Sequence, residues 1–191
     1  RHLEELSERY EGNEEIALAY AKGLVNLSNK QEEGGAKESV RHLEELSERY
    51  EGNEEIALEY ANGLVNLSCE QEEAGREESV RRLEELSGRY EGNEEIALEY
   101  AKGLFNLSNK QEEGGAEESV RRLEELSGRY EGNEEIALAY AQGLFSLLCV
   151  QDESKRKGLL KRLNAIRKKY KLVDEWFASF FQELKINRNI P

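Results

Sequence analysis

The sequence repeats itself with a period of 40 residues. The stretch RYEGNEEIALEYA occupies 49–61 and again 89–101, and near-copies with one Ala for Glu stand one period before the first and one period after the second. Residues 11–50 and 51–90 differ at only nine of forty positions. Such self-similarity is typical of repeat architectures, in which each unit buries its apolar face by stacking on its neighbours. We therefore expect stacked helical units rather than one globular core.

Each period predicts two helices, which we call helix A and helix B. In 51–90, Asn53 is a suitable N-cap for helix A, and acidic residues follow it where the helix dipole favours negative charge. Helical spacing then places six apolar side chains on one stripe: Ile56, Ala57, Tyr60, Ala61, Leu64 and Leu67. We expect helix A to run to about Glu73. Glycines should stop it, namely Gly75 here and Gly34–Gly35 and Gly114–Gly115 in the sister repeats.

Helix B is predicted from about Glu77 to Tyr90. Its apolar stripe consists of Val80, Leu83, Leu86 and Tyr90, and the residues EGN then turn the chain into the next period. The chain has one Pro and is dominated by good helix formers. The predicted class is all-α, an α-solenoid of stacked antiparallel helix pairs with about nine helices.

We expect a single repeat domain over 1–191, beginning with a partial repeat that holds helix B only. Its segments are 1–10 (partial), 11–50, 51–90 and 91–130 (near-identical), 131–170 (diverged) and 171–191 (C-terminal capping helix). In the diverged repeat, 157–170 aligns with 117–130 and predicts core positions at Leu160, Leu163, Ile166 and Tyr170. The chain has no Met, so we expect it to belong to a longer polypeptide.

Aromatic residues gather near the end of the chain. Residues 173–184 align with a helix A and carry Trp176, Phe177, Phe180, Phe181 and Leu184. The first interpretation is a bulkier core in a terminal unit, because capping units of stacked repeats differ from interior ones. The second is a docking surface for a missing segment or for another chain.

The charge is acidic and uneven. The chain has 27 Lys and Arg against 41 Asp and Glu, a formal charge of −14, and residues 151–191 contain eleven of the former and five of the latter. The formal charge is therefore about −20 over 1–150 and about +6 over 151–191. An acidic body argues against nucleic acid as a partner, because phosphate binding needs the opposite sign. No apolar run approaches the ~20 residues of a membrane span, so we expect no membrane segment.

Two cysteines, Cys69 and Cys149, stand in the same register two periods apart. Equivalent atoms of stacked repeats lie farther apart than the ~7 Å that a disulfide can bridge between Cα atoms. We predict two free thiols and a cytoplasmic, reducing location.

The repeat resembles the tetratricopeptide repeat family. Ser39, Leu43 and Leu46 resemble its small–large pattern in helix B, YEGNEE resembles its turn, and Ala57, Tyr60, Ala61 and Leu64 resemble its helix A set. The repeat is about six residues longer than in that family, with Ala57 in place of a large aromatic, Ala61 in place of Gly and Glu51 in place of Pro. The resemblance implies a right-handed superhelix. Sel1-like, HEAT and armadillo repeats are alternatives with fewer matching markers.

In that family helix A lines a concave groove, so the resemblance implies a partner-binding face on helix A. Carried over by position, with equivalents in other repeats, this face would comprise Leu18, Lys22, Val25, Asn26, Leu58, Asn62, Val65, Asn66, Leu98, Lys102, Phe105, Asn106, Leu138, Gln142 and Phe145. Glu55 belongs to the same set. The resemblance also suggests that its Lys and Asn side chains clamp a peptide carboxylate.

Differences between the copies provide an independent argument for this face. Helix A varies at 19/59/99/139, 22/62/102/142, 25/65/105/145 and 29/69/109/149. Steps of three and four place these positions on one side of a helix, and core positions do not vary so freely because packing resists volume changes. We therefore expect this side to be open to solvent or to a partner. The alternative is a solvated groove that binds nothing.

No candidate catalytic, cofactor-binding or metal-ligating cluster is present. His2 and His42 occupy helix B positions where other copies have Arg, so we expect them at the surface. The sequence predicts a protein–protein interaction scaffold without enzymatic activity, whose acidic repeats favour a protein or peptide partner of basic character. The alternative is a structural spacer or a rod that assembles head to tail through its two ends. A consensus-like repeat that only folds is a variant of this alternative.

Overall fold

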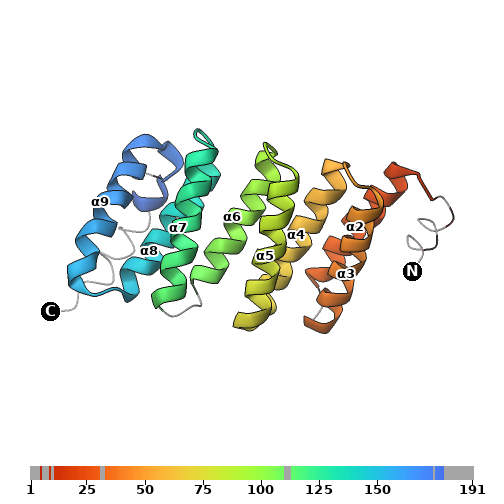
Figure 1. The fold of residues 1–191 in the computed structure, drawn as a ribbon, viewed down its shortest axis with the longest axis horizontal. Coiled ribbons are helices and arrows are strands. Elements are labelled where there is room, and N and C mark those ends of the chain that lie inside the picture. The colour runs from red at the N-terminus through yellow and green to blue at the C-terminus, as the bar shows by residue number, and fades with distance from the viewer. Residues whose placement is uncertain are drawn as a thin grey trace. The chain divides into compact units, whose positions relative to one another are not determined.

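The computed structural model describes residues 5, 9, 11–30, 33–109, 113–173 and 175–178. Its elements within these ranges are helices without strands, which confirms the all-α class. The bounded helices alternate between helix A (α2, α4, α6, α8) and helix B (α3, α5, α7, α9), as Figure 1 shows. They are α2 (Glu14–Ser28), α3 (Glu33–Arg49), α4 (Glu54–Glu70), α5 (Glu73–Arg89), α6 (Glu94–Ser108), α7 (Glu113–Arg129), α8 (Glu134–Val150) and α9 (Glu153–Lys169).

The chain forms two compact units. Unit 1 is Arg1–Leu107 and contains α2 to α5 with all of α6 except its last residue, and unit 2 is Ser108–Pro191 and contains α7, α8 and α9. In unit 1, α4 contacts α2, α3 and α5, and in unit 2, α8 contacts α7 and α9. Within its own unit, each of α4 and α8 thus contacts both the helix B before it and the helix B after it.

The predicted start and apolar face of helix A are confirmed. The side-chain oxygen of Asn53 accepts a hydrogen bond from the backbone N–H of Ile56 at 3.0 Å and caps α4. The six predicted stripe residues of α4 are all buried. Ile56, Ala57 and Ala61 are fully buried, and the small side chains of the two alanines allow neighbouring helices to approach closely.

The apolar face of helix B is also confirmed. Val80, Leu83, Leu86 and Tyr90 are at most 9% exposed. Their equivalents in α3 and α7 are buried as well: Val40, Leu43, Leu46 and Tyr50 in α3, and Val120, Leu123, Leu126 and Tyr130 in α7. The 3.6-residue period of the sequence therefore locates the core correctly.

A glycine in helix A sets how closely it packs on the preceding helix B. A Cβ atom at Gly63 would lie 2.6 Å from Leu43 Cδ1 and 3.4 Å from Val40 Cγ2. A Cβ atom at Gly143 in unit 2 would lie 2.8 Å from Cδ1 of the equivalent Leu123. Leu43 and Leu123 are fully buried and have little room to move. A side chain at the glycine position would separate the two helices.

Two long-range hydrogen bonds hold the EGN turn, one within its own repeat and one to the repeat before it. Gly52 has a φ of +91°, which L side chains rarely adopt, and its N–H donates to the hydroxyl of Tyr90 at 3.2 Å. The side-chain amide of Asn53 donates to the carboxylate of Glu14 in the preceding helix A at 2.7 Å. The turn is thus bound both to the end of its own repeat and to helix A of the repeat before it.

The predicted end of helix A is wrong. Helix α4 ends at Glu70 rather than near Glu73, and Gly75 lies inside helix B, because α5 begins at Glu73. The guanidinium of Arg76 donates to the carbonyls of Ser68 at 2.9 Å and Gln71 at 2.5 Å. These bonds satisfy carbonyls that have no partner within α4. The other glycines that we expected to act as stops also lie in helices, Gly34–Gly35 in α3 and Gly114–Gly115 in α7.

Arg76 also explains a difference in length between the A helices. Helices α4 and α8 have 17 residues and α2 and α6 have 15. Arg156 stands at the position of Arg76 after α8 and donates to the Gln151 carbonyl at 2.8 Å, whereas Ala36 and Ala116 stand there after the shorter helices. The 40-residue repeat therefore alternates between two forms.

The register predicted for the diverged repeat is partly wrong. Leu163 and Tyr170 are buried as predicted, but Leu160 is 39% exposed and its neighbour Leu159 is buried. In the interior repeats a valine stands at the position of Leu160 and lies against the glycine of the next helix A, as Val120 lies against Gly143. The residue that would take the place of this glycine beside Leu160 is outside the described ranges. Trp176 is half-buried and Phe177 is buried, while Phe180, Phe181 and Leu184 also lie outside these ranges.

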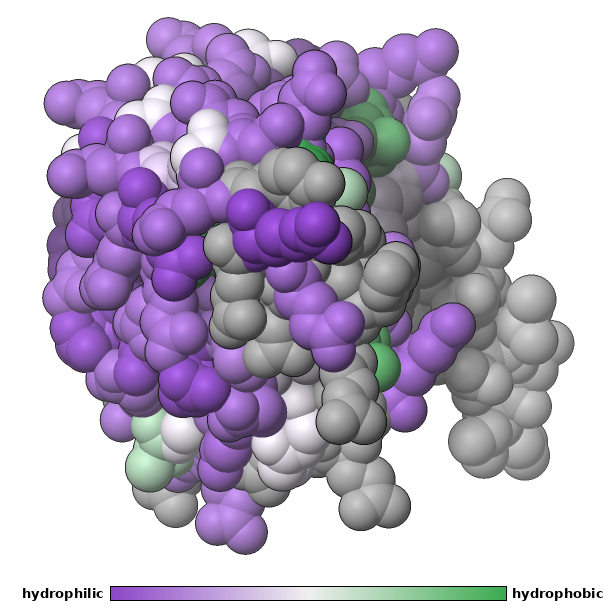
Figure 2. Space-filling model, turned by 90° about the vertical axis from the view of Figure 1, so that its right-hand side faces the viewer, coloured by the Kyte–Doolittle hydropathy of each residue, from purple (hydrophilic) through white to green (hydrophobic). Residues whose placement is uncertain are grey.

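Hydrophilic side chains cover most of the described surface in the view of Figure 2. Few large apolar side chains are exposed among the described residues, namely Leu27, Val150 and Leu160. Of the helices that the structure describes, none is long and apolar enough to cross a membrane.

The close approach at the helix A glycine predicts a clear mutational result. We expect Gly103→Ala to lower the free energy of unfolding by about 1–3 kcal/mol, because the new Cβ would lie 2.6 Å from Leu83 Cδ1 in a filled core. The matched control is Gly88→Ala in α5, where nothing lies within 4 Å and the change should stabilise by up to about 1 kcal/mol. Urea unfolding measures both. Equal effects of the two substitutions would contradict the role assigned to Gly103.

Candidate interaction surfaces

The fifteen residues of the predicted helix A face lie on all four A helices. Twelve are in unit 1, on α2, α4 and α6, and the other three, Leu138, Gln142 and Phe145, are on α8 of unit 2. None of the fifteen is buried. Lys22, Asn26 and Lys102 are exposed and the rest are half-buried. We call the side of α2, α4 and α6 that carries the twelve residues the helix-A face.

A charged cluster joins α2 and α4 on the helix-A face. Burial raises the pKa of the Glu59 carboxyl, and the charge of Glu55 raises it further. The ammonium of Lys22, from the preceding repeat, and a hydrogen bond from Asn62 act against this and lower the same pKa. The structure therefore brings predicted site residues from two repeats around one carboxylate.

Asn106 is engaged within the repeat stack. Its side-chain amide donates to Ser68 Oγ and to Cys69 Sγ in α4, both at 3.3 Å. This asparagine therefore positions α6 against α4, in addition to the partner contact predicted for it. Cys69 and Cys149 are free and exposed, as the sequence predicted. Burial raises the pKa of the Cys149 thiol, while the charge of Arg156 lowers it.

One of the four variable positions does not fit the expectation of an open surface. Glu99 is 7% exposed and Ala139 is 5% exposed, although Ala19 is exposed. Glu99 precedes Asn106 by seven residues, which places both on the same side of α6, and Asn106 contacts α4. Glu99 is thus buried on the side of α6 that faces α4, and its carboxylate accepts a hydrogen bond from Lys102 Nζ at 2.6 Å.

A second type of surface lies on the helix B side, which the sequence analysis did not single out. In unit 1, a cavity of about 250 Å³ opens between α3 and α5. The Tyr60 hydroxyl donates to Glu44 at 3.1 Å, and Arg82 binds the same carboxylate at 3.0 Å. At the inner end, the Ser79 hydroxyl donates to Gln71 Oε1 at 2.8 Å.

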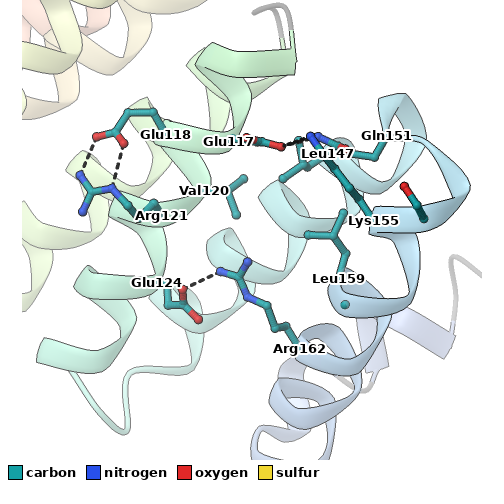
Figure 3. Close-up of a pocket in the computed structure, with 12 residues that line it drawn as sticks. Glu117, Glu118, Val120, Arg121, Glu124, Leu147, Gln151, Lys155, Leu159 and Arg162 are labelled. Carbon is teal, nitrogen blue, oxygen red and sulfur yellow. Dashed lines mark hydrogen bonds and ion pairs between the residues drawn. The ribbon is translucent and has the colours of Figure 1, made fainter.

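The equivalent cavity in unit 2 is larger, about 730 Å³, and lies between α7 and α9 (Figure 3). The Glu124 carboxylate accepts hydrogen bonds from the Tyr140 hydroxyl at 2.7 Å and from Arg162 at 2.6 Å. The same Tyr–Glu–Arg triad is thus present in both cavities. At the upper side of the view in Figure 3, Lys155 Nζ and Gln151 Nε2 donate hydrogen bonds to the Glu117 carboxylate. The donor–acceptor distances are 3.0 Å for Lys155 and 2.8 Å for Gln151. We call these two cavities the helix-B crevices.

The charges of the helix-B crevices neutralise one another. Arg81 and Arg82 both bind Glu78 and lower the pKa of its carboxyl to about 2. In unit 2, hydrogen bonds from Lys155 and Gln151 lower the pKa of Glu117. Burial raises the pKa of Tyr60 and Tyr140, which keeps both hydroxyls protonated as donors. The arrangement joins successive B helices by charge-assisted hydrogen bonds.

The triad had a signal in the sequence. Glu44, Tyr60 and Arg82 each recur one and two periods later, as Glu84 and Glu124, Tyr100 and Tyr140, and Arg122 and Arg162. Positions that only maintain the packing recur in the same way. The recurrence therefore does not indicate that these three side chains contact one another, which only the fold shows. In the first repeat His42 replaces the arginine, and its ring lies 6.4 Å from that of Tyr20.

Among the described residues, no group of three or more His, Cys, Asp or Glu side chains is placed to hold a metal ion. Comparisons with protein-family models, curated proteins and solved structures found no match for this chain.

The low pKa of Glu78 predicts a pH-dependent contribution to stability. A carboxyl whose pKa is lowered on folding stabilises the protein above its unfolded pKa, and this contribution is lost as the pH falls towards 2. We expect Glu78→Gln to reduce stability by less than about 1 kcal/mol at pH 7, since the pair is solvent-exposed. The difference from wild type should vanish near pH 2.

Urea unfolding between pH 2 and 7 measures this effect. The same substitution at Glu48, an exposed residue of α3 outside the helix-B crevices, reports the effect of removing one negative charge. A difference at Glu78 that does not change with pH would show that the Arg81 and Arg82 pairs do not stabilise the fold.

Proposed function

We propose that this chain is a protein–protein interaction scaffold of tetratricopeptide-like type. Its helix-A face would bind a basic, partly apolar segment of another protein. A reducing, cytoplasmic location is part of the proposal and is supported by the two free, exposed thiols.

The observation that carries the proposal is a half-exposed apolar strip beside a row of carboxylates. The strip recurs along unit 1, with Leu58 and Val65 on α4 and Leu98 and Phe105 on α6. Single exposed apolar residues are common on protein surfaces, but here they recur at equivalent positions of successive A helices. Such a strip supplies the apolar contact that a docking peptide needs.

The carboxylates lie at the start of each A helix. Glu15, Glu55 and Glu95 are exposed and have no hydrogen-bond or ion-pair partner in the part of the chain that the structure describes. Their neighbours Glu14 and Glu54 are bound by asparagines of the next repeat. We call Glu15, Glu55 and Glu95 the acidic row. Its charge favours a basic partner by steering and by complementarity.

The second candidate function is a structural spacer. It is favoured by the number of polar side chains that bind the next repeat. Examples in unit 1 are Asn53 on Glu14, Asn93 on Glu54 and Arg82 on Glu44. A chain that only has to separate or stiffen other segments would need these contacts and no ligand.

A binding experiment separates the two candidates. Fluorescence anisotropy would follow a labelled peptide of alternating Lys and Leu, with a Glu and Leu peptide of equal length as the probe control. We expect the basic peptide to bind and the acidic one not to bind. Glu55→Lys with Glu95→Lys should weaken binding at least about tenfold, which is about 1.4 kcal/mol.

The matched protein control is Glu48→Lys with Glu51→Lys, which makes the same change of charge at exposed positions off the helix-A face. Leu58→Ser with Phe105→Ala tests the apolar strip without changing the charge. If both charge-reversed proteins lose the same affinity, binding reflects net charge alone and the assigned face is wrong. An absence of binding to the basic peptide would favour the spacer.

A further inference from the structure

Interior B helices carry a charge clamp on their outer side. In α5, Arg81 binds Glu78 three residues before it at 2.7 Å and also binds Glu85 four residues after it. Arg41 in α3 and Arg121 in α7 make the same two contacts with the carboxylates at those spacings. Each clamp places one cation between two anions, so the outer side of an interior helix B presents no unpaired positive charge at this position.

Helix α9 lacks both anions of the clamp. Lys161 stands at the position of Arg81, but Gly158 and Ala165 stand where the two glutamates would be. Lys157 and Lys168 lie four residues before and seven residues after Lys161, which places the three ammonium groups along one side of the helix. All three lysines are exposed. We call them the α9 lysine stripe.

The other basic residues near the crevice are engaged within unit 2. Lys155 pairs with Glu117, Arg162 pairs with Glu124, and Lys169 pairs with Glu131. By contrast, Lys157, Lys161 and Lys168 have no ion-pair or hydrogen-bond partner among the residues that the structure describes. Three unpaired cations on one side of one helix form a surface that attracts an anionic partner.

We propose that the α9 lysine stripe docks on the acidic row of a second copy of this chain. The inference rests on the proposed function, since it makes α9 a basic ligand of the helix-A face. Charge complementarity argues for this occupant, because residues 1–150 hold 36 acidic against 16 basic side chains. Neither the carboxylates of the acidic row nor the ammonium groups of the α9 lysine stripe have a partner among the described residues, so the two sets can form ion pairs with each other.

The spacing of the two sets of charges is compatible with this contact. Lys161 and Lys168 are seven residues apart, about 10.5 Å along a helix. Packed helices lie about 8–10 Å apart, so carboxylates at equivalent positions of adjacent A helices recur at a similar distance. The flexible ends of Lys and Glu side chains absorb the remaining difference. This contact differs from end-to-end packing, because it uses the sides of helices.

Analytical ultracentrifugation of the whole chain at increasing concentration tests the contact, in 25 mM and in 300 mM NaCl. We expect the average mass to rise with concentration in low salt and to fall towards the monomer in high salt, because salt screens exposed charges. Two variants should remain monomeric in low salt. One is Lys157→Glu with Lys161→Glu and Lys168→Glu, and the other is Glu55→Lys with Glu95→Lys.

A mixture of these two variants provides the decisive result. In one variant the charge of the α9 lysine stripe is reversed, and in the other the charge of the acidic row is reversed. The acidic stripe of the first should bind the basic row of the second, so that association returns. Gly158→Glu with Ala165→Glu restores the interior clamp around Lys161 and should weaken association at least threefold. The control is Lys30→Glu with Lys37→Glu, which introduces the residues found one period later at 70 and 77 and should leave association unchanged.

Three outcomes would overturn the inference. The first is a wild-type chain that stays monomeric in low salt; if it still binds the Lys and Leu peptide, the proposed function stands and only self-docking fails. The second is association that survives reversal of the lysine stripe. The third is association that depends on the stripe but not on Glu55 and Glu95, which would place the partner surface elsewhere.

Discussion

The fold depends on one close contact, in which a glycine of α4, α6 or α8 packs against a leucine of the helix B before it. Gly63 lies so near Leu43 that a Cβ would come within 2.6 Å of its Cδ1 atom. The fully buried alanines of helix A, such as Ala57 and Ala61, allow the same close approach. Since core packing is dense and resists volume changes, the contact sets the distance between helices within a unit. The polar contacts on either side can form only at this distance.

Polar contacts between repeats then divide the surface into two kinds. On the helix B side, the Tyr–Glu–Arg triads join successive helices and the clamps pair charges within each helix B. On the helix-A face, the acidic row and the half-exposed apolar strip recur without being used in this way. A surface whose charges are already neutralised gains little from a partner, whereas unpaired charges favour one.

Helix α9 departs from this division. It keeps the inward contacts of a helix B, because Arg162 binds Glu124 and the Tyr170 hydroxyl accepts a hydrogen bond from the N–H of Gly132 at 3.5 Å. Its outer side has lost the glutamates of the clamp and gained lysines. The repeat can change in this way because the outer side of helix B does not touch the core, so substitutions there leave the packing intact.

The sequence by itself determined the helix class, the period, the N-cap at Asn53 and nearly every buried position of the interior repeats, because 3.6-residue spacing depends only on local geometry. It did not determine where helix A ends, since that depends on Arg76 reaching back to carbonyls of the preceding helix. Nor did it show that Glu99 is buried, that Leu160 is exposed, or that Glu44, Tyr60 and Arg82 meet. These features arise from contacts between different helices, and only the tertiary structure brings those residues together.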